Sequence, residues 1–286
     1  MDDKGVERIL LTVGTSIALL GLYRLVEWFM RRSRSIPREM AGGNLAGHLL
    51  SAGHALAVLL LLPGIVKNCV SGESLSADAI SALLFGSAGV VVIELAGALG
   101  VKLLVRGSLE REVADGNVAA GVAGAANYVA IGVLASRAIG GTSAKELGIS
   151  IAFFALSIVT LTIFVGLFRA ITTYDDEEQV RGRNLAAAIS YAGVSVSVAL
   201  ITARALEGKF TTWEESLTGY ALVAVCALIL YPVRQIVVQG LLLWRAPTLR
   251  GGALDRAIGL ERKVGLAVLE SFAYVATAIT ITEFLV

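Results

Sequence analysis

The chain has 286 residues, of which 56% are hydrophobic and 16% are charged, and its formal net charge is +1. Soluble domains carry about 25% charged residues, so this chain lacks the polar surface that would cover a water-soluble globule. A net charge of +1 gives no indication of nucleic-acid binding, so no nucleic-acid partner is expected. The composition indicates an integral membrane protein whose first partner is the lipid bilayer.

Apolar blocks of about 20 residues recur along the whole chain, and each is long enough to cross a bilayer core of about 30 Å as a helix. In lipid only helices and closed barrels satisfy their backbone hydrogen bonds, and the blocks show no alternating strand pattern. They predict an all-α integral membrane protein with eight transmembrane helices, forming a single membrane domain over residues 1–286. The predicted spans cover about 8–30, 44–66, 77–104, 117–139, 147–171, 184–206, 216–244 and 263–285.

The loops between these spans differ in charge. The loops after the odd-numbered spans hold thirteen Lys and Arg residues, whereas those after the even-numbered spans hold three. The positive-inside rule places the cation-rich loops in the cytoplasm, so both termini are expected to face outward, N-out and C-out. In the first loop, Arg31, Arg32, Arg34 and Arg38 follow the first apolar block. A cleaved signal peptide carries its positive charge before the apolar block, so we expect a retained first span.

Residues 110–141 and 177–208 share one pattern. Each has a charged segment, an Asn-x-Ala-Ala opening, an apolar run, an Arg twenty residues after the Asn, and a Gly. Because every unit then has two spans, the units are expected to run parallel, around a pseudo-symmetry axis along the membrane normal. The pattern predicts four two-helix repeat units at about 1–70, 71–143, 144–210 and 211–286.

An asparagine opens the second span in each of the first three units. These residues are Asn44, Asn117 and Asn184, and Lys263 occupies the equivalent place in the fourth unit. An Asn at the start of a helix accepts hydrogen bonds from free backbone N–H groups, so the three asparagines are predicted to be helix caps. Small residues four apart in the following spans favour close helix packing.

The motif of the second unit reads Gly116-Asn117-Val118-Ala119-Ala120-Gly121 and closes with Arg137, and the third unit repeats it as Arg183-Asn184-Leu185-Ala186-Ala187-Ala188. These motifs resemble the YjfL-like family of bacterial inner-membrane proteins, whose function is unknown. The resemblance covers the middle half of the chain best. Members look like four-span proteins built from two such pairs, so this chain resembles a doubled version. The resemblance implies a multi-pass protein of the bacterial inner (plasma) membrane and a link to envelope stress, and it supplies no catalytic residues.

Four ionisable residues lie deep inside the predicted spans. Glu94, Arg234, Glu270 and His54 fall at about the same depth, roughly 10–15 Å from the cytoplasmic helix ends at 1.5 Å per residue. A charge at the centre of a membrane helix costs on the order of 3 kcal/mol or more. One interpretation is an ion or proton path in which Arg234 is neutralised by Glu270, Glu94 or both. The other is a buried structural ion pair that fixes helix packing.

Two further sets of charges lie near span ends. Arg137 and Arg204 occupy matching places at the outer interface, where they either extend to the interface or form an anion or lipid-headgroup site. The acidic run Asp175–Glu178 is expected to be a solvated turn, with a docking patch or divalent-cation binding as the alternative. It lacks the ligand spacing of a known calcium loop.

The sequence contains no nucleophile elbow, Walker loop, HExxH motif or dinucleotide fingerprint, so we predict no enzyme activity, no metal site and no cofactor. Two functions remain open. One is a small-ion or proton channel or transporter built on the buried charges. The other is a non-transporting scaffold, either a homo-oligomer or a platform for cytoplasmic envelope-stress proteins. A connected wet cavity would favour transport, whereas a dry bundle with its charges paired would favour the scaffold.

Overall fold

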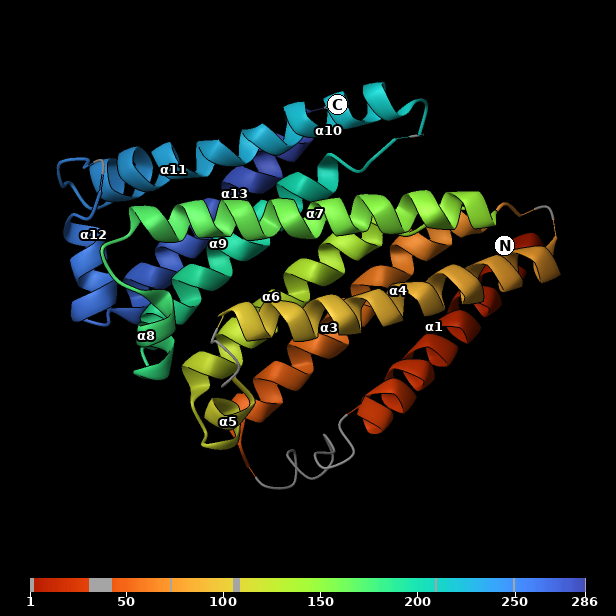
Figure 1. Ribbon diagram of the computed structural model, residues 1–286, viewed down its shortest axis with the longest axis horizontal. Helices are drawn as coiled ribbons and strands as arrows, with labels where there is room; N and C mark the ends of the chain where they lie inside the picture. Colours follow the sequence, from red (N-terminus) through yellow and green to blue (C-terminus); the bar gives the residue numbers. More distant parts are fainter. Residues whose placement is uncertain are drawn as a thin grey trace.

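The computed structural model describes residues 3–30, 43–72, 74–104, 109–208, 210–248 and 250–285 (Figure 1). The arginine-rich first loop, Arg31 to Arg38, lies outside the described residues. Within the described ranges all regular structure is helical, and eight helices are long and apolar enough to cross a membrane. The predicted fold class and the predicted number of spans are therefore confirmed.

The eight spans fall into four consecutive pairs, and we keep the word unit for each pair. The first spans are α1 (Asp3–Met30), α4 (Leu75–Leu104), α7 (Ala144–Ile171) and a composite seventh span, Trp213–Leu242. The second spans are α3 (Leu45–Cys69), α6 (Val118–Ala138), α9 (Leu185–Arg204) and α13 (Val264–Phe284). Short helices precede the last three second spans: α5 (Leu109–Ala114), α8 (Asp176–Arg181), and α12 (Ala253–Asp255) with η3 (Arg256–Leu260). Figure 1 shows α5, α8 and α12 gathered at one end of the bundle, which we call the cap face.

The four second spans form a row in the order α3, α6, α9, α13, and each packs extensively on the next. The first spans cover the sides of this row: α4 contacts α3 and α6, and α7 contacts α6 and α9. Because α4, α7 and the seventh span each contact two neighbouring second spans, α6 and α9 become the most deeply buried spans. The pairs follow one another across the molecule in chain order (Figure 1).

Glycines allow α3 and α6 to cross closely. A Cβ atom added at Gly132 would lie 2.5 Å from the Cα and 2.8 Å from the Cβ of Ala57, and one at Gly121 would lie 2.6 Å from the carbonyl oxygen of Ala46. Real Cβ contacts are not this short, so the interface requires glycine at these positions. Small residues at helix interfaces are the usual means of close packing in membranes, where lipid is as apolar as the side chains.

The same backbone turn precedes all four second spans. A residue in the left-handed region comes first, and an extended residue follows it with φ between −81° and −71° and ψ between 92° and 99°. The left-handed residues are Gly43, Gly116, Arg183 and Arg262, and the extended residues are Asn44, Asn117, Asn184 and Lys263. Lys263 thus has the backbone geometry of the three asparagines.

The seventh span is irregular. It consists of α10 (Trp213–Val225), the 3-10 turn η1 (Cys226–Ile229), α11 (Leu230–Pro232) and the π-helix η2 (Val233–Leu242). Pro232 has no N–H group to donate and its ring crowds the preceding turn, which explains a break in α-helical geometry here. The π-helical turns bury Arg234, Gln235 and Gln239 inside the protein. Such π-helical segments are frequent at functional sites.

Candidate functional site

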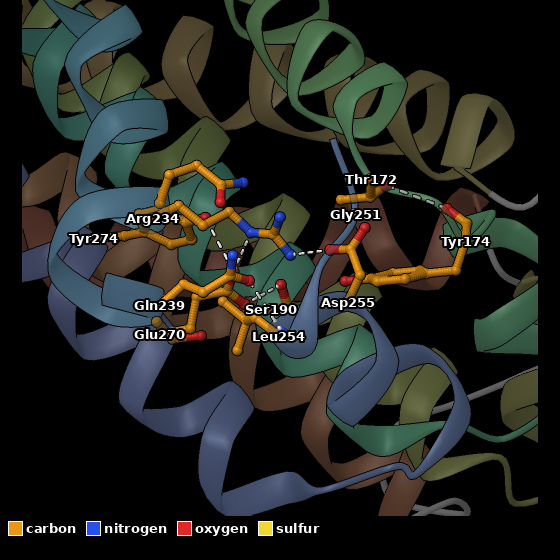
Figure 2. Close-up of polar contacts among 12 residues, drawn as sticks. Thr172, Tyr174, Ser190, Arg234, Gln239, Gly251, Leu254, Asp255, Glu270 and Tyr274 are labelled. Carbon is orange, nitrogen blue, oxygen red and sulfur yellow. Dashed lines mark hydrogen bonds and ion pairs between the residues drawn. The ribbon is translucent and has the colours of Figure 1, made fainter. Parts of the chain in front are cut away.

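Arg234 forms the centre of a buried ion cluster in the second half of the chain (Figure 2). Its Nε atom donates to Oε1 of Glu270 at 2.6 Å, and its Nη2 atom is paired with Oδ1 of Asp255. The three residues are at most 3% exposed. We call Arg234, Asp255 and Glu270 the Arg234 centre. The sequence prediction that Arg234 pairs with Glu270 matches this contact, whereas the contribution of Asp255 was not predicted.

Hydroxyl and amide groups satisfy the remaining carboxylate oxygens. Ser190 of α9 donates to Oε2 of Glu270 at 2.5 Å, and the hydroxyl of Tyr274 donates to Oε1 at 3.1 Å. Asp255 accepts at Oδ2 from the backbone N–H and the hydroxyl of Thr173, at 2.7 and 3.0 Å. Burying charge is costly unless every group has a partner, and each carboxylate oxygen of this centre has one.

The loop after the seventh span folds back into the protein and brings Asp255 to Arg234. Gln239 of η2 donates through Nε2 to the carbonyl of Ala246 at 2.8 Å and accepts from the N–H of Leu254 at 3.2 Å. Gly252 has φ 108°, and a Cβ atom there would lie 2.5 Å from Oε1 of Gln239. The side-chain amide of Gln239 therefore makes hydrogen bonds to the backbone of this loop. Only glycine fits at position 252, where the chain passes close to that amide.

A narrow pocket connects the cap face to the Arg234 centre. Its lining includes Arg169, Tyr174 and Asp176 at the level of α8, and Arg234 and Tyr274 further in. The space holds roughly one or two water molecules.

Asp176 is the acidic residue that lines this pocket. It is buried, and so is its neighbour Glu177, so the expectation of a fully solvated turn is wrong for these two residues. Burial raises the pKa of Asp176 from 3.8 to about 7, although Arg169, whose Nε lies 3.3 Å from Oδ2, opposes the shift. Burial and the nearby Glu270 likewise hold the pKa of Tyr174 well above its usual value. Asp175, by contrast, is exposed and caps α8 by accepting from the N–H groups of Glu177 and Glu178.

A second buried pair lies in the first half of the chain. His54 of α3 contacts Glu94 of α4 through Nε2 and Oε1, and their side chains are 1% and 5% exposed. The imidazole ring stacks on Tyr128 with ring centroids 4.1 Å apart and meets the edge of Tyr23 at 4.7 Å. Glu94 therefore pairs with His54 and not with Arg234, so the four predicted residues form two separate pairs and not one continuous belt.

The asparagine caps also link consecutive units. Each accepts from the backbone of its own helix, and its Nδ2 atom donates to a carbonyl in the short helix of the following unit. Asn44 donates to Val113 at 2.8 Å, Asn117 to Val180 at 2.8 Å and Asn184 to Ile258 at 2.9 Å. Lys263 makes no side-chain cap and pairs with Glu261 in its own turn. The sequence predicted the caps but not these inter-unit bonds.

The two outer arginines meet at one carboxylate. Arg137 at the end of α6 lies 3.0 Å from Glu207, and Arg204 at the end of α9 contacts the same side chain. Arg204 also donates to the carbonyl of Leu285, 2.6 Å away, just after α13. Glu207 therefore occupies the space between the two cations that the sequence left open for an external anion.

Some of these residues carried a weak sequence signal. Gln235 and Gln239 lie four residues apart and beside Arg234 in an apolar span. Together they form a polar helix face, which in a membrane span indicates a contact inside the protein. Asp255 had none, because it stands in a loop rich in arginines that reads as solvated. Among the described residues, no group of three or more His, Cys, Asp or Glu side chains is placed to hold a metal ion.

Comparison with known proteins identifies a family. The family described as Domain of Unknown Function (DUF350) matches residues 3–139 and again residues 142–285. No curated protein and no solved structure matches the chain. The two matches confirm that this is a doubled, four-plus-four arrangement of spans. The chain therefore belongs to the DUF350 family and carries two consecutive copies of its domain.

Proposed function

We propose that the protein is a channel or transporter for protons or small ions, with the Arg234 centre as its working site. The observation that carries this proposal is the charge of the centre: one guanidinium faces two carboxylates beside a pocket that leads to the cap face. With all three groups ionised the centre bears one excess negative charge. A single bound proton or monovalent cation would make it neutral.

The second carboxylate lowers the energetic cost of binding a proton or cation at this centre. A buried ion pair that loses one partner leaves an uncompensated charge, which costs about 3–5 kcal/mol. At this centre Glu270 can be neutralised while Arg234 keeps Asp255 as its counter-ion. The centre can therefore alternate between two charge states and keep its arginine paired in both.

We place the protein in the inner membrane of a bacterium, with the cap face in the cytoplasm. The cation-rich loops and the family resemblance support this orientation. The proposal requires no covalent chemistry from the chain.

Purified full-length protein in liposomes tests the proposal. An internal pH dye and a panel of Na⁺, K⁺ and Cl⁻ gradients should reveal flux through the wild type, and Glu270→Gln should abolish it. Glu283→Gln is the matched control, because Glu283 lies on the same helix and is exposed. Absence of flux for every ion tested, in folded wild-type protein, would refute transport.

A second candidate function is a non-transporting scaffold. Its support is that every carboxylate oxygen of the Arg234 centre already has a hydrogen-bond or ion-pair partner, as in a purely structural cluster. In that case partners would be further copies of the chain or cytoplasmic envelope-stress proteins docking on the cap face. A stable oligomer or captured cytoplasmic complex together with no flux would favour this function.

A further inference from the structure

The pocket beside Asp176 has the geometry of a proton relay. At its outer end Asp176 lies against Arg169, and at its inner end Arg234 and Tyr274 belong to or contact the buried centre. Ser190, which donates to Glu270, also lines it. The pocket thus joins an acid at the cap face to the hydroxyl groups and the guanidinium that surround Glu270.

The size of this pocket selects against metal ions. Its space holds roughly one or two water molecules, less than the shell that a hydrated cation carries. A dehydrated cation needs several oxygen ligands in exchange for its water. The oxygens of Glu270 and Asp255 already accept from Arg234, Ser190, Tyr274 and Thr173. A proton needs only one oxygen lone pair and no coordination shell.

The charged surroundings agree with this selection. Asp176 and its pocket are surrounded by charged and titratable groups on five elements and in the loop before its own helix. These groups are Arg169 on α7, Tyr174 and Asp175 before α8, Tyr191 on α9, Tyr231 on α11, Arg234 on η2, and Glu270 and Tyr274 on α13. The two arginines keep their charge, whereas the acids can change theirs by exchanging a proton through neutral water.

We infer that the transported species is the proton and that Asp176 exchanges it between the cap face and the Arg234 centre, an inference that rests on the proposed transport function. In the step toward the centre the carboxyl group of Asp176 releases its proton to water in the pocket. That water gives a proton to the hydroxyl oxygen of Ser190, and Ser190 passes the proton that it already donates on to Glu270. Asp176 becomes a carboxylate paired with Arg169, Glu270 becomes a neutral acid, and Arg234 keeps Asp255. The reverse step restores the starting state, and no other reactant is required.

Three variants test this assignment in liposomes that contain a pH dye, under an imposed pH gradient with the membrane potential clamped. Asp176→Asn should slow proton flux by about tenfold or more, because the amide cannot carry the proton. Asp176→Glu should retain flux. Glu178→Gln should match the wild type, because Glu178 lies on the same short helix and is exposed. Wild-type flux should change most steeply near neutral pH, where Asp176 titrates.

The outcomes separate this inference from the transport proposal. Wild-type liposomes that pass Na⁺ or K⁺ but no protons would overturn the inference and leave transport standing. Proton flux through folded Asp176→Asn at the wild-type rate would remove Asp176 from the path. Gel filtration in detergent shows whether each variant folds, and if Asp176→Asn does not, the ion panel on the wild type still decides between proton and metal ion. Wild-type liposomes without any flux would refute transport itself.

Discussion

The Nδ2 atom of Asn117 lies 2.8 Å from the carbonyl oxygen of Val180, which is 63 residues further along the chain. The same asparagine accepts from the N–H of Ala120 in the first turn of its own helix. One fully buried side chain therefore both starts α6 and holds the short helix of the next unit. The fold repeats this double role at Asn44 and Asn184.

Replacing Asn117 should separate the two roles. Asn117→Ser keeps an oxygen that caps helices about as well as asparagine but is too short to reach Val180. We expect it to cost about 1–3 kcal/mol, because the buried carbonyl loses its donor. Asn117→Ala should cost about 1 kcal/mol more through loss of the cap. Unfolding in detergent followed by circular dichroism measures both, and a serine variant as stable as the wild type would refute the inter-unit bond.

Removing Arg234 should destabilise the protein strongly. Arg234→Ala leaves Asp255 and Glu270 buried without their cation, at a cost of about 3–5 kcal/mol. Arg245→Ala, at an exposed arginine, should stay within about 0.5 kcal/mol of the wild type. Adding Glu270→Gln to Arg234→Ala should recover part of the loss, because it removes one of the stranded charges. Equal thermal stability of the two single variants would contradict the buried cluster.

The stability of the protein should fall as pH rises through the acidic range. Asp176 has an ordinary pKa of 3.8 when unfolded and about 7 when folded, so the folded state binds the proton more tightly. Its contribution is therefore most favourable below about pH 4 and is lost progressively up to about pH 7. Melting temperatures in detergent at pH 5 and pH 8 should differ less for Asp176→Asn than for the wild type. An identical pH dependence would show that Asp176 is not buried.

Gly132 should tolerate no side chain. Gly132→Ala forces a Cβ atom to within 2.8 Å of Ala57 on α3 and should cost about 1–3 kcal/mol through overpacking. Gly148→Ala provides the control, because a Cβ atom there meets nothing within 4 Å. In the helix α7 this change should be neutral or stabilise by up to about 1 kcal/mol. Similar melting temperatures for both variants would contradict the close crossing of α3 and α6.

Labelling of single cysteines should place the cap face on one side of the membrane. With Cys69 and Cys226 replaced by alanine, cysteines at Glu110 and Glu178 should react with an impermeant maleimide from the cytoplasmic side. A cysteine at Glu214, before the seventh span crosses the membrane, should react from the other side. Labelling of positions 110 and 178 from opposite sides would contradict the parallel units. Labelling of both from outside would reverse the orientation.

Composition and periodicity predicted the eight spans, because membrane helices are marked by length and hydropathy that depend on no neighbour. Depth along a span also brought Arg234 and Glu270 to one level. Depth alone does not say which neighbouring helix a side chain faces. The sequence therefore left Glu94 as a possible partner for Arg234. The row of second spans separates them, since Glu94 faces α3 and Arg234 faces α13.

Asp255 shows what the sequence could not supply. Its place in an arginine-rich loop predicts solvent exposure, and only the fold of that loop onto Gln239 reverses this. The hydrogen bonds between units could not be predicted for a related reason. A cap is a local pattern, whereas the carbonyl that receives the second bond lies 63 to 74 residues away and has no side-chain signature.

The bond from Asn117 to Val180 crosses the junction between the two copies of the family domain, and it has the same form as the bonds inside each copy. The contact between the two domain copies is therefore built in the same way as the contacts within each copy. Cutting the chain near residue 141 would open an Ala-rich helix contact between α6 and α9 and strand a buried amide donor on one fragment. The separated halves should associate again or aggregate, because neither fragment alone can cover the exposed contact surface of α6 or α9.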